Sequence, residues 1–225
     1  MNRRILLLLL AVLVATPALR AERRVKAGFR GGLLSRTYIF DQQSLSLTNA
    51  EGGKLGEYET LSLKSNYGFE AGASCRVRLW KSLNESTGAS LHLQLDALYS
   101  QHKISLDARN EGDDANVLTS EITASTVDVP LVACLKASVV RLSAGPVLHA
   151  YSQYETTGGN ARFEGLPSLC GFTLGIGFDF GKVTLDGRYV GEFTKNSWSV
   201  IKKDNGAAHL TGRRTGWSLC LGLMF

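Results

Sequence analysis

The stretch that decides the fold is Gly216-Trp-Ser-Leu-Cys-Leu-Gly-Leu-Met-Phe225. Its large apolar residues recur at every second position, a period of two that predicts a β-strand with one apolar face. A soluble domain rarely ends on such a strand, because an open apolar edge invites aggregation. A closed membrane barrel, in contrast, needs a last strand that pairs with the first one. We therefore expect the apolar row of this strand to act as a C-terminal barrel-assembly signal: Trp217, Leu219, Leu221, Leu223 and Phe225.

The first 21 residues have the pattern of a secretory signal peptide. A short basic start, Asn2-Arg3-Arg4, precedes an unbroken apolar run over residues 5–14, and small residues surround Pro17. The apolar run is too short to cross a membrane core of about 30 Å as a helix. We predict cleavage near Ala21, which leaves residues 22–225 as one barrel domain. Without the three arginines of the signal, 22 Lys and Arg face 20 Asp and Glu, and this formal net charge of +2 makes nucleic acid a poor candidate partner.

Eight segments of the predicted mature chain alternate between apolar and polar residues. One face of each segment carries no charge, whereas the opposite faces together carry seven positive and six negative side chains. The segments are residues 25–33, 67–79, 91–100, 126–136, 141–154, 170–180, 183–193 and 216–225. The charged side chains are Lys26, Arg30, Glu70, Arg76, Arg78, Asp96, Asp128, Lys136, Arg141, Asp179, Asp186, Arg188 and Glu192.

Two kinds of barrel fit this alternation. A soluble, lipocalin-like barrel places the apolar face inside, whereas a membrane barrel turns it toward lipid. An eight-stranded barrel has an interior that side chains just fill, and a face of glycines and paired ions suits that space better than rows of Phe and Leu. We therefore predict an all-β fold, an eight-stranded antiparallel up-and-down transmembrane β-barrel with a charge network in its lumen.

The connections between these segments alternate in length. Residues 41–60, 107–121, 155–167 and 195–210 are long and polar, whereas the others are short, as in outer-membrane barrels with periplasmic turns and longer outer loops. Both termini then lie in the periplasm. Aromatic residues near the two ends are expected to form girdles: Tyr67, Tyr99, Phe193, Trp217 and Trp198 at the outer end, and Trp80, Phe180 and Phe225 at the inner end.

Several of these segments resemble a known family. Residues 91–102, Val127-Asp-Val-Pro-Leu131, Arg141-Leu-Ser-Ala-Gly-Pro146 and residues 175–189 are similar, in this order, to strands of the small outer membrane protein β-barrel family of Gram-negative bacteria. Members are described as porin-family or PorT-like proteins and are eight-stranded barrels of the OmpA/OmpX type. The resemblance implies an outer-membrane location and no catalytic residues.

Candidate chemistry is sparse. Four cysteines (Cys75, Cys134, Cys170 and Cys220) lie on strands that are not neighbours, which favours free thiols over disulfides. Ser100 and His102 share the polar face near the outer rim and could form the Ser-His pair of a lipid hydrolase or protease. No nucleophile elbow and no third member accompany them, so a polar lumenal pair is the favoured interpretation.

Two loops carry concentrated charge. The carboxylates Asp107, Glu111, Asp113, Asp114 and Glu121 could bind calcium, but their spacing misses the EF-hand pattern and favours a solvated acidic loop. The cations Lys195, Lys202, Lys203, Arg213 and Arg214 surround Trp198 and could bind lipid phosphates. A plain solvated loop is an equal alternative.

The sequence thus predicts an outer-membrane barrel with a largely plugged lumen and a structural or interaction role. The alternatives are a small-solute porin and an outer-membrane lipid-modifying enzyme. We expect no catalytic residues, no cofactor and no metal. The expected partners are outer-membrane lipid, lipopolysaccharide and the outer-membrane assembly machinery, and the sequence does not identify an extracellular partner.

Overall fold

The structure, a computed structural model, describes residues 25–41, 45–48, 54–58, 60–82, 88–110, 113–159, 161–165, 168–202 and 207–225. The predicted signal peptide, residues 1–21, lies outside the described residues. Within these ranges, no helix has the length and apolar character needed to span a bilayer.

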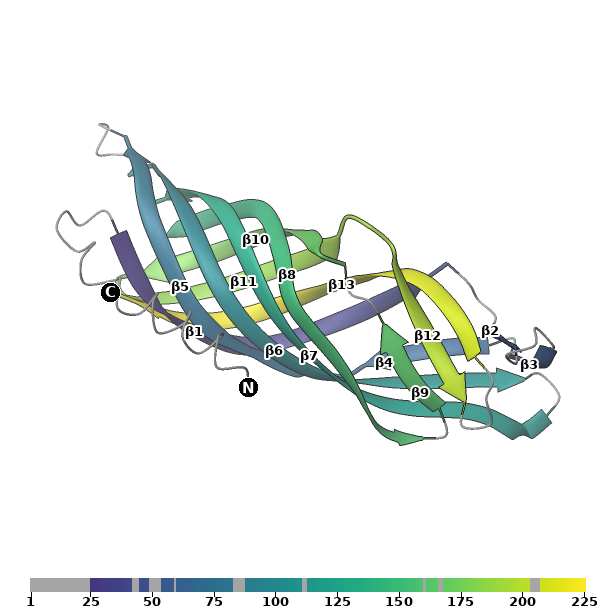
Figure 1. Cartoon of the computed structure of the whole chain (residues 1–225). Coiled ribbons are helices and arrows are strands. Elements are labelled where there is room, and N and C mark those ends of the chain that lie inside the picture. The colour runs from purple at the N-terminus through teal and green to yellow at the C-terminus, as the bar shows by residue number, and fades with distance from the viewer. Residues whose placement is uncertain are drawn as a thin grey trace.

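Eight long antiparallel strands form a closed ring (Figure 1). Each strand pairs with the next, and the last pairs with the first from Gly28 opposite Met224 to Phe40 opposite Gly212. The predicted eight-stranded up-and-down barrel is therefore confirmed. The strands are β1 (Val25–Phe40), β5 (Gly68–Lys81), β6 (Ser90–Asn110), β7 (Asp113–Ala137), β8 (Val140–Gly159), β10 (Cys170–Phe180), β11 (Val183–Glu192) and β13 (Ala207–Met224).

The two ends of the barrel differ. At one end, here called the turn end, tight turns join β7 to β8 and β10 to β11, and Gly181 adopts a positive φ of 66° that favours glycine. Phe225 also lies there, paired with Ala27 of β1. At the other end, the extension end, strands reach well beyond the middle of the barrel and short strands join them (Figure 1). The short strands are β2 (Leu45–Thr48), β3 (Lys54–Tyr58), β4 (Thr60–Ser65), β9 (Ala161–Gly165) and β12 (Asn196–Lys202).

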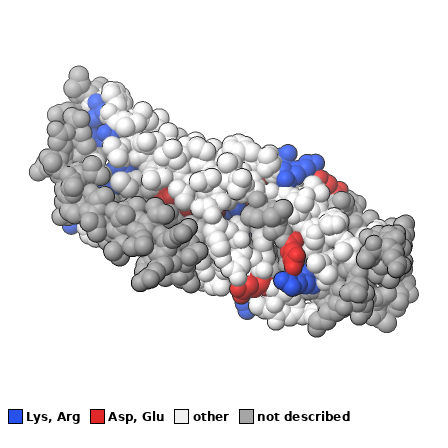
Figure 2. Space-filling view, viewed as in Figure 1, with Lys and Arg blue, Asp and Glu red and all other residues white. Residues whose placement is uncertain are grey.

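A belt of apolar side chains covers the outside of the barrel from the turn end to about the middle of the long strands. Along β6 the outward residues run from Leu91 to Tyr99, and along β13 they include Leu221, which is 62% exposed. Figure 2 shows that the described surface around the middle of this face is almost free of Lys, Arg, Asp and Glu. Inside the same part of the barrel, the buried side chains include arginines and carboxylates. The barrel is thus apolar outside and ionic inside.

Beyond the belt, the polarity of the two faces reverses on the same strands: outward residues are polar and inward residues are apolar. The alternation between inward and outward positions continues unchanged. On β6 the outward residues become polar, as at Lys103 and Ser105, while the inward residues Ile104, Leu106 and Ala108 are fully buried. Inward side chains from several strands form one apolar cluster, the outer core. Its buried members are Tyr38, Ile104, Leu106, Ala108, Leu118, Ile122, Ala124, Trp198, Val200, Ala208 and Leu210.

Three predictions about this end were wrong. Much of residues 107–121, 155–167 and 195–210 forms strands instead of loops, because the outer core gives the strands apolar contacts beyond the belt. Trp198 is 1% exposed and packs edge-on against Tyr38 inside this core, so it is not part of the outer girdle. The alternation of residues 141–154 predicts that Tyr151 shares the polar, inward face with His149. Tyr151 instead points outward, because β8 bulges where Asp128 pairs with His149 and Val127 pairs with Tyr151.

Candidate functional site: the lumenal charge network

The lumen contains a layered network of ions. The structure buries six arginines and six carboxylates inside the barrel. Ten of these were among the charged residues predicted from the alternation, and Arg36 and Arg214 are additional. The remaining predicted cations are less buried and lie near the turn end: Lys26 is exposed, and Arg78 and Lys136 are half-buried.

Near the turn end, Asp179 of β10 is shared by three cations. Its Oδ2 atom lies 3.0 Å from Arg76 Nη1 and 3.0 Å from Lys136 Nζ, and its Oδ1 atom accepts a hydrogen bond from Arg141 Nη1. The other guanidinium nitrogen of Arg141 pairs with Asp186. Gly177 makes room for this pair, because a Cβ atom there would lie 2.5 Å from both Arg141 Nη2 and Asp186 Oδ1.

In the next layer, Asp96 of β6 is the acceptor for two arginines. Arg188 Nη1 donates to its Oδ2 atom at 2.6 Å, and Arg30 Nη1 donates to the same atom at 3.2 Å. Gln94 connects this layer with the one below it, since its Nε2 atom donates to Asp96 Oδ1 at 2.8 Å and its Oε1 atom accepts from Arg76 Nε at 2.9 Å. Every oxygen of this buried carboxylate therefore has a donor, as a buried charge requires.

Two of these ion pairs cross the full width of the bore. Along the closed ring of eight strands, β6 lies opposite β11 and β5 lies opposite β10. Arg188 on β11 nevertheless reaches Asp96 on β6, and Arg76 on β5 reaches Asp179 on β10. The side chains of opposite walls thus meet across the bore at these two levels.

The layer toward the extension end is centred on Asp128 of β7. Arg36 Nη2 lies 3.2 Å from Asp128 Oδ2, and His149 Nδ1 lies 2.6 Å from Oδ1. Arg214 donates through Nε to Glu192 Oε1 at 3.1 Å. Sequence reasoning missed Arg36 because the first strand was ended at Leu33. The alternation itself continues through inward Leu34, Arg36 and Tyr38, and it could have revealed this residue.

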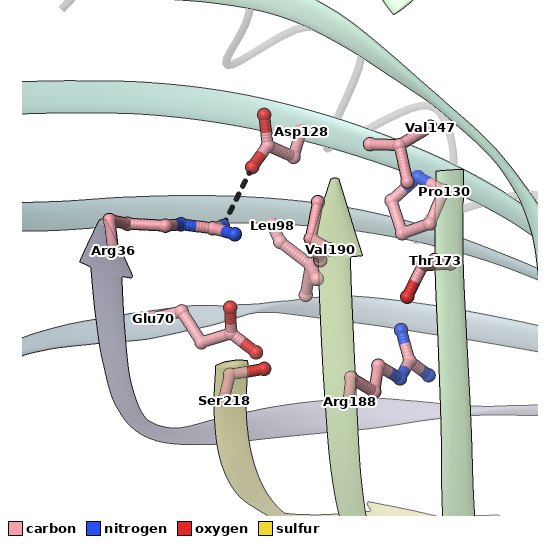
Figure 3. A pocket seen from close by; sticks show the side chains of 10 residues that line it. All are labelled: Arg36, Glu70, Leu98, Asp128, Pro130, Val147, Thr173, Arg188, Val190 and Ser218. Atoms are coloured by element: carbon pink, nitrogen blue, oxygen red, sulfur yellow. Dashed lines mark hydrogen bonds and ion pairs between the residues drawn. The ribbon is translucent and has the colours of Figure 1, made fainter. Parts of the chain in front are cut away.

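Glu70 differs from the other five carboxylates in this network. Among the described residues, no Lys or Arg pairs with it; instead it accepts a hydrogen bond from Cys220 Sγ at 2.8 Å. Glu70 borders a small cavity with room for about one water molecule. Figure 3 shows the Arg36–Asp128 pair, Glu70 and Arg188 around this space. Among the described residues, Arg36 Nε and Arg188 Nη2 are buried without a hydrogen-bond acceptor, so a bridging water suits the cavity.

Ser100 and His102 both face inward and are nearly fully buried, yet they have separate partners. Ser100 Oγ lies 2.7 Å from Thr126 Oγ1, whereas His102 Nε2 lies 3.1 Å from the hydroxyl of Tyr38. His102 lies beyond the apolar belt, and burial, with Arg36 and Arg214 nearby, lowers its pKa to about 3. This neutral imidazole joins the ionic network to the outer core, and the observed contacts do not form a catalytic dyad.

The other predicted sites are only partly covered by the structure. All four cysteines are free thiols: Cys134 and Cys220 are buried, Cys75 is half-buried and Cys170 is exposed. Glu111 of the acidic loop lies outside the described residues, as do the side chains of Asp113 and Asp114. No group of three His, Cys, Asp or Glu side chains in the described part of the chain could hold a metal ion.

The basic loop predicted around Trp198 does not exist as one cluster. Arg214 points into the lumen, where it pairs with Glu192, and Lys195 pairs with Asp41 at 2.9 Å. Arg213 is exposed. The side chain of Lys202 and all of Lys203 lie outside the described residues.

The fold and the network define a closed antiparallel β-barrel that is ionic inside and apolar outside. Among solved structures, the chain is similar to the outer membrane protein OprG from Pseudomonas aeruginosa, with a TM-score of 0.56 and 12% identity over 89% of this chain and 95% of that chain. No protein-family model and no curated protein matches the chain. At this identity, the likeness supports the fold of the barrel.

Proposed function

We propose that the chain is a bacterial outer-membrane protein with a closed lumen and a structural or interaction role. The observation that carries this proposal is the polarity of the barrel: the Arg188–Asp96 pair crosses the interior, while the outward face of the same strands is apolar. Exposure of so large an apolar area to water is unfavourable, whereas its contact with lipid is not. The similarity to an outer-membrane barrel of known structure supports the same location.

In this proposal the signal peptide exports the chain from the cytoplasm of a Gram-negative bacterium, and the assembly machinery reads its C-terminal strand. The turn end faces the periplasm, because outer-membrane barrels have their short turns there. Aromatic residues flank the belt in the expected way, with Trp217 and Tyr99 toward the extension and Phe225 and Trp80 toward the turns. Membership of the porin-family, PorT-like group stays a prediction.

An interaction role is supported by the extension. Its walls enclose a packed apolar core, so the polar outer surface is held in a fixed shape outside the membrane. Lys103 and Arg213 are exposed just beyond the belt, where lipopolysaccharide phosphates would lie in an outer membrane. Lipid and lipopolysaccharide are therefore the partners we propose, and a protein partner would bind farther out on the extension.

The location is tested by fractionation of the expressed full-length chain, combined with gel mobility before and after boiling. We expect the chain in the outer-membrane fraction, in a folded form that migrates differently until boiled. Recovery as a soluble periplasmic or secreted protein would contradict the proposed location.

The closed lumen is tested in planar bilayers. The purified protein should show no steady single-channel conductance, because the Arg188–Asp96 layer, the Arg76–Asp179 layer and the outer core each fill the bore with side chains. Insertion into the bilayer is checked separately by the heat-modifiable gel mobility of the reconstituted protein. Appreciable conductance of the wild type would favour the small-solute porin instead.

A further inference from the structure

Among the described residues, the buried charges of the lumen balance in total, and additional cations lie at the turn-end mouth. The six buried arginines are matched by six buried carboxylates. Three further cations point into the same lumen near the turns, namely Lys26, Arg78 and Lys136. Among the described residues they have no additional carboxylate, so the excess of three positive charges is concentrated at this mouth.

The strand register brings these like charges together. Lys26 of β1 is directly opposite Arg76 of β5, and Arg78 is the next inward residue on β5. On the other side of the mouth, Lys136 of β7 is directly opposite Arg141 of β8. Directly opposed like charges destabilise a strand pair, so an arrangement with two such pairs implies a compensating anion.

Asp179 provides only part of that compensation. Its two oxygens already accept from Arg76, Lys136 and Arg141. Lys26 and Arg78 have no ion pair with any described residue, and Lys26 is exposed, so an ion entering from the turn end can reach both. Their side chains share the inward face with Arg76 and therefore point away from lipid.

We propose that the turn-end mouth binds a small oxyanion of the phosphate type, either inorganic phosphate or the phosphate of a larger molecule, between Lys26, Arg78 and Lys136. A double negative charge offsets most of the local excess of three positive charges, and the fork of an arginine with two flanking ammonium groups suits phosphate oxygens. Because the cations point into the lumen, a free phosphate fits better than a headgroup in the surrounding bilayer. In the orientation proposed above, this site opens to the periplasm.

The proposal is tested by isothermal titration calorimetry with inorganic phosphate on the whole protein in a nonionic detergent, at constant ionic strength maintained with chloride. We expect saturable binding near one phosphate per barrel. Lys26→Gln and Arg78→Gln should each weaken it about tenfold or more, the scale of one lost charged hydrogen bond. Arg109→Gln, which removes an exposed arginine at the extension end, is the matched control and should leave the affinity within about twofold.

Folding of each variant is checked by heat-modifiable mobility, and stability gives a second readout. Phosphate should raise the urea midpoint of the wild type and of Arg109→Gln, but not that of the Lys26 and Arg78 variants. In nanodiscs, phosphate binding that disappears only when phosphatidylglycerol is added would identify the lipid phosphate as the occupant of the same site.

Two results would overturn the proposal. The first is the absence of saturable binding to the wild type, and the second is equal affinity for Arg78→Gln and Arg109→Gln. A Glu85→Gln variant gives the first result a specific cause; Glu85 lies in the β5–β6 connection outside the described residues. If phosphate binds to Glu85→Gln and not to the wild type, the chain supplies its own counter-ion. None of these results depends on where the barrel resides in the cell.

Discussion

An arginine at Leu95 would test the membrane placement of the belt most directly. Leu95 lies at the centre of the outward row that runs along β6 from Leu91 to Tyr99, and it is 45% exposed. Each end of the row is four residues away, or about 13 Å along the strand and roughly 10 Å along the membrane normal after tilt. An arginine at Leu95 therefore lies near the midplane, beyond easy reach of either surface.

The expected cost follows from this depth. Arginine on the lipid face of an outer-membrane barrel costs about 2–4 kcal/mol at the midplane and about 0–1 kcal/mol near the surfaces. Ser105→Arg is the matched control, because Ser105 points outward on the same strand beyond the belt, opposite exposed Glu121. We expect Leu95→Arg to lower the free energy of unfolding by about 2–4 kcal/mol and Ser105→Arg to change it by less than about 1 kcal/mol.

The assay is reversible urea unfolding in phospholipid vesicles, followed by tryptophan fluorescence. Trp80 and Trp217 lie on the outside of the barrel and report on contact with lipid. If Leu95→Arg costs no more than Ser105→Arg, the outward leucines face water and the membrane assignment is wrong. The two variants add the same side chain to the same strand, so the strand preference of arginine itself does not explain a difference between them.

Four further predictions concern the interior, and urea unfolding in vesicles measures each of them. Asp96→Asn removes the charge shared by two buried arginines and should cost about 3–5 kcal/mol; a smaller loss than that of an exposed Glu→Gln change would contradict the network. Glu70→Gln should change stability by less than about 1 kcal/mol, because no cation pairs with Glu70, and a loss equal to that of Asp96→Asn would refute this distinction. Leu106→Ala in the outer core should cost about 2–5 kcal/mol, and a neutral result would mean that the extension is not packed. The pKa of His102 is about 3 in the folded protein and about 6.5 when unfolded, so the unfolded chain binds the extra proton as the pH falls from 6.5 toward 3; stability should decline over this window, and less steeply in His102→Gln.

The sequence predicted the part of the fold that lies within the belt. There, neighbouring residues such as Phe178 and Asp179 differ strongly in polarity. A shift of the strand register by one residue would therefore exchange the apolar and polar faces completely. The alternation therefore indicated the strands and their two faces. Two further arguments were needed: the apolar C-terminal strand indicated a closed ring, and the limited space inside eight strands indicated that the charged face points inward.

The extension was not predicted because its strands have the opposite polarity to the belt. Residues Lys103-Ile-Ser-Leu-Asp-Ala-Arg109 alternate as regularly as the belt, but the apolar residues change to the opposite parity. A strand was expected to end where its outward residues became polar, as at Gln101. The pattern of period two was present, and continuing it through the change of polarity would have predicted both the longer strands and the outer core.

The ion pairs of the lumenal network could not be predicted from the sequence, for a different reason. Parity gives the direction of a side chain, but the height at which Arg188 meets Asp96 depends on the stagger of strands on opposite sides of the barrel. The three cations around Asp179 and the thiol beside Glu70 depend on the same stagger. Arg214 was assigned to a loop because its strand was predicted to begin at Gly216, nine residues after the observed start at Ala207.

In the proposed membrane placement, the two halves of the barrel require opposite interiors for one physical reason. Within lipid, burial of an apolar side chain gains little, because lipid is as apolar as leucine, so cohesion across the bore comes from pairs such as Arg188–Asp96. In water, apolar burial is the main favourable contribution, and Ile104 and Leu106 provide cohesion across the extension. The interior must therefore change from ions to an apolar core at the height where the exterior passes from lipid to water. On β6 both changes occur within the same few residues, between Tyr99 and Ile104, and the contact between His102 and Tyr38 lies at this boundary.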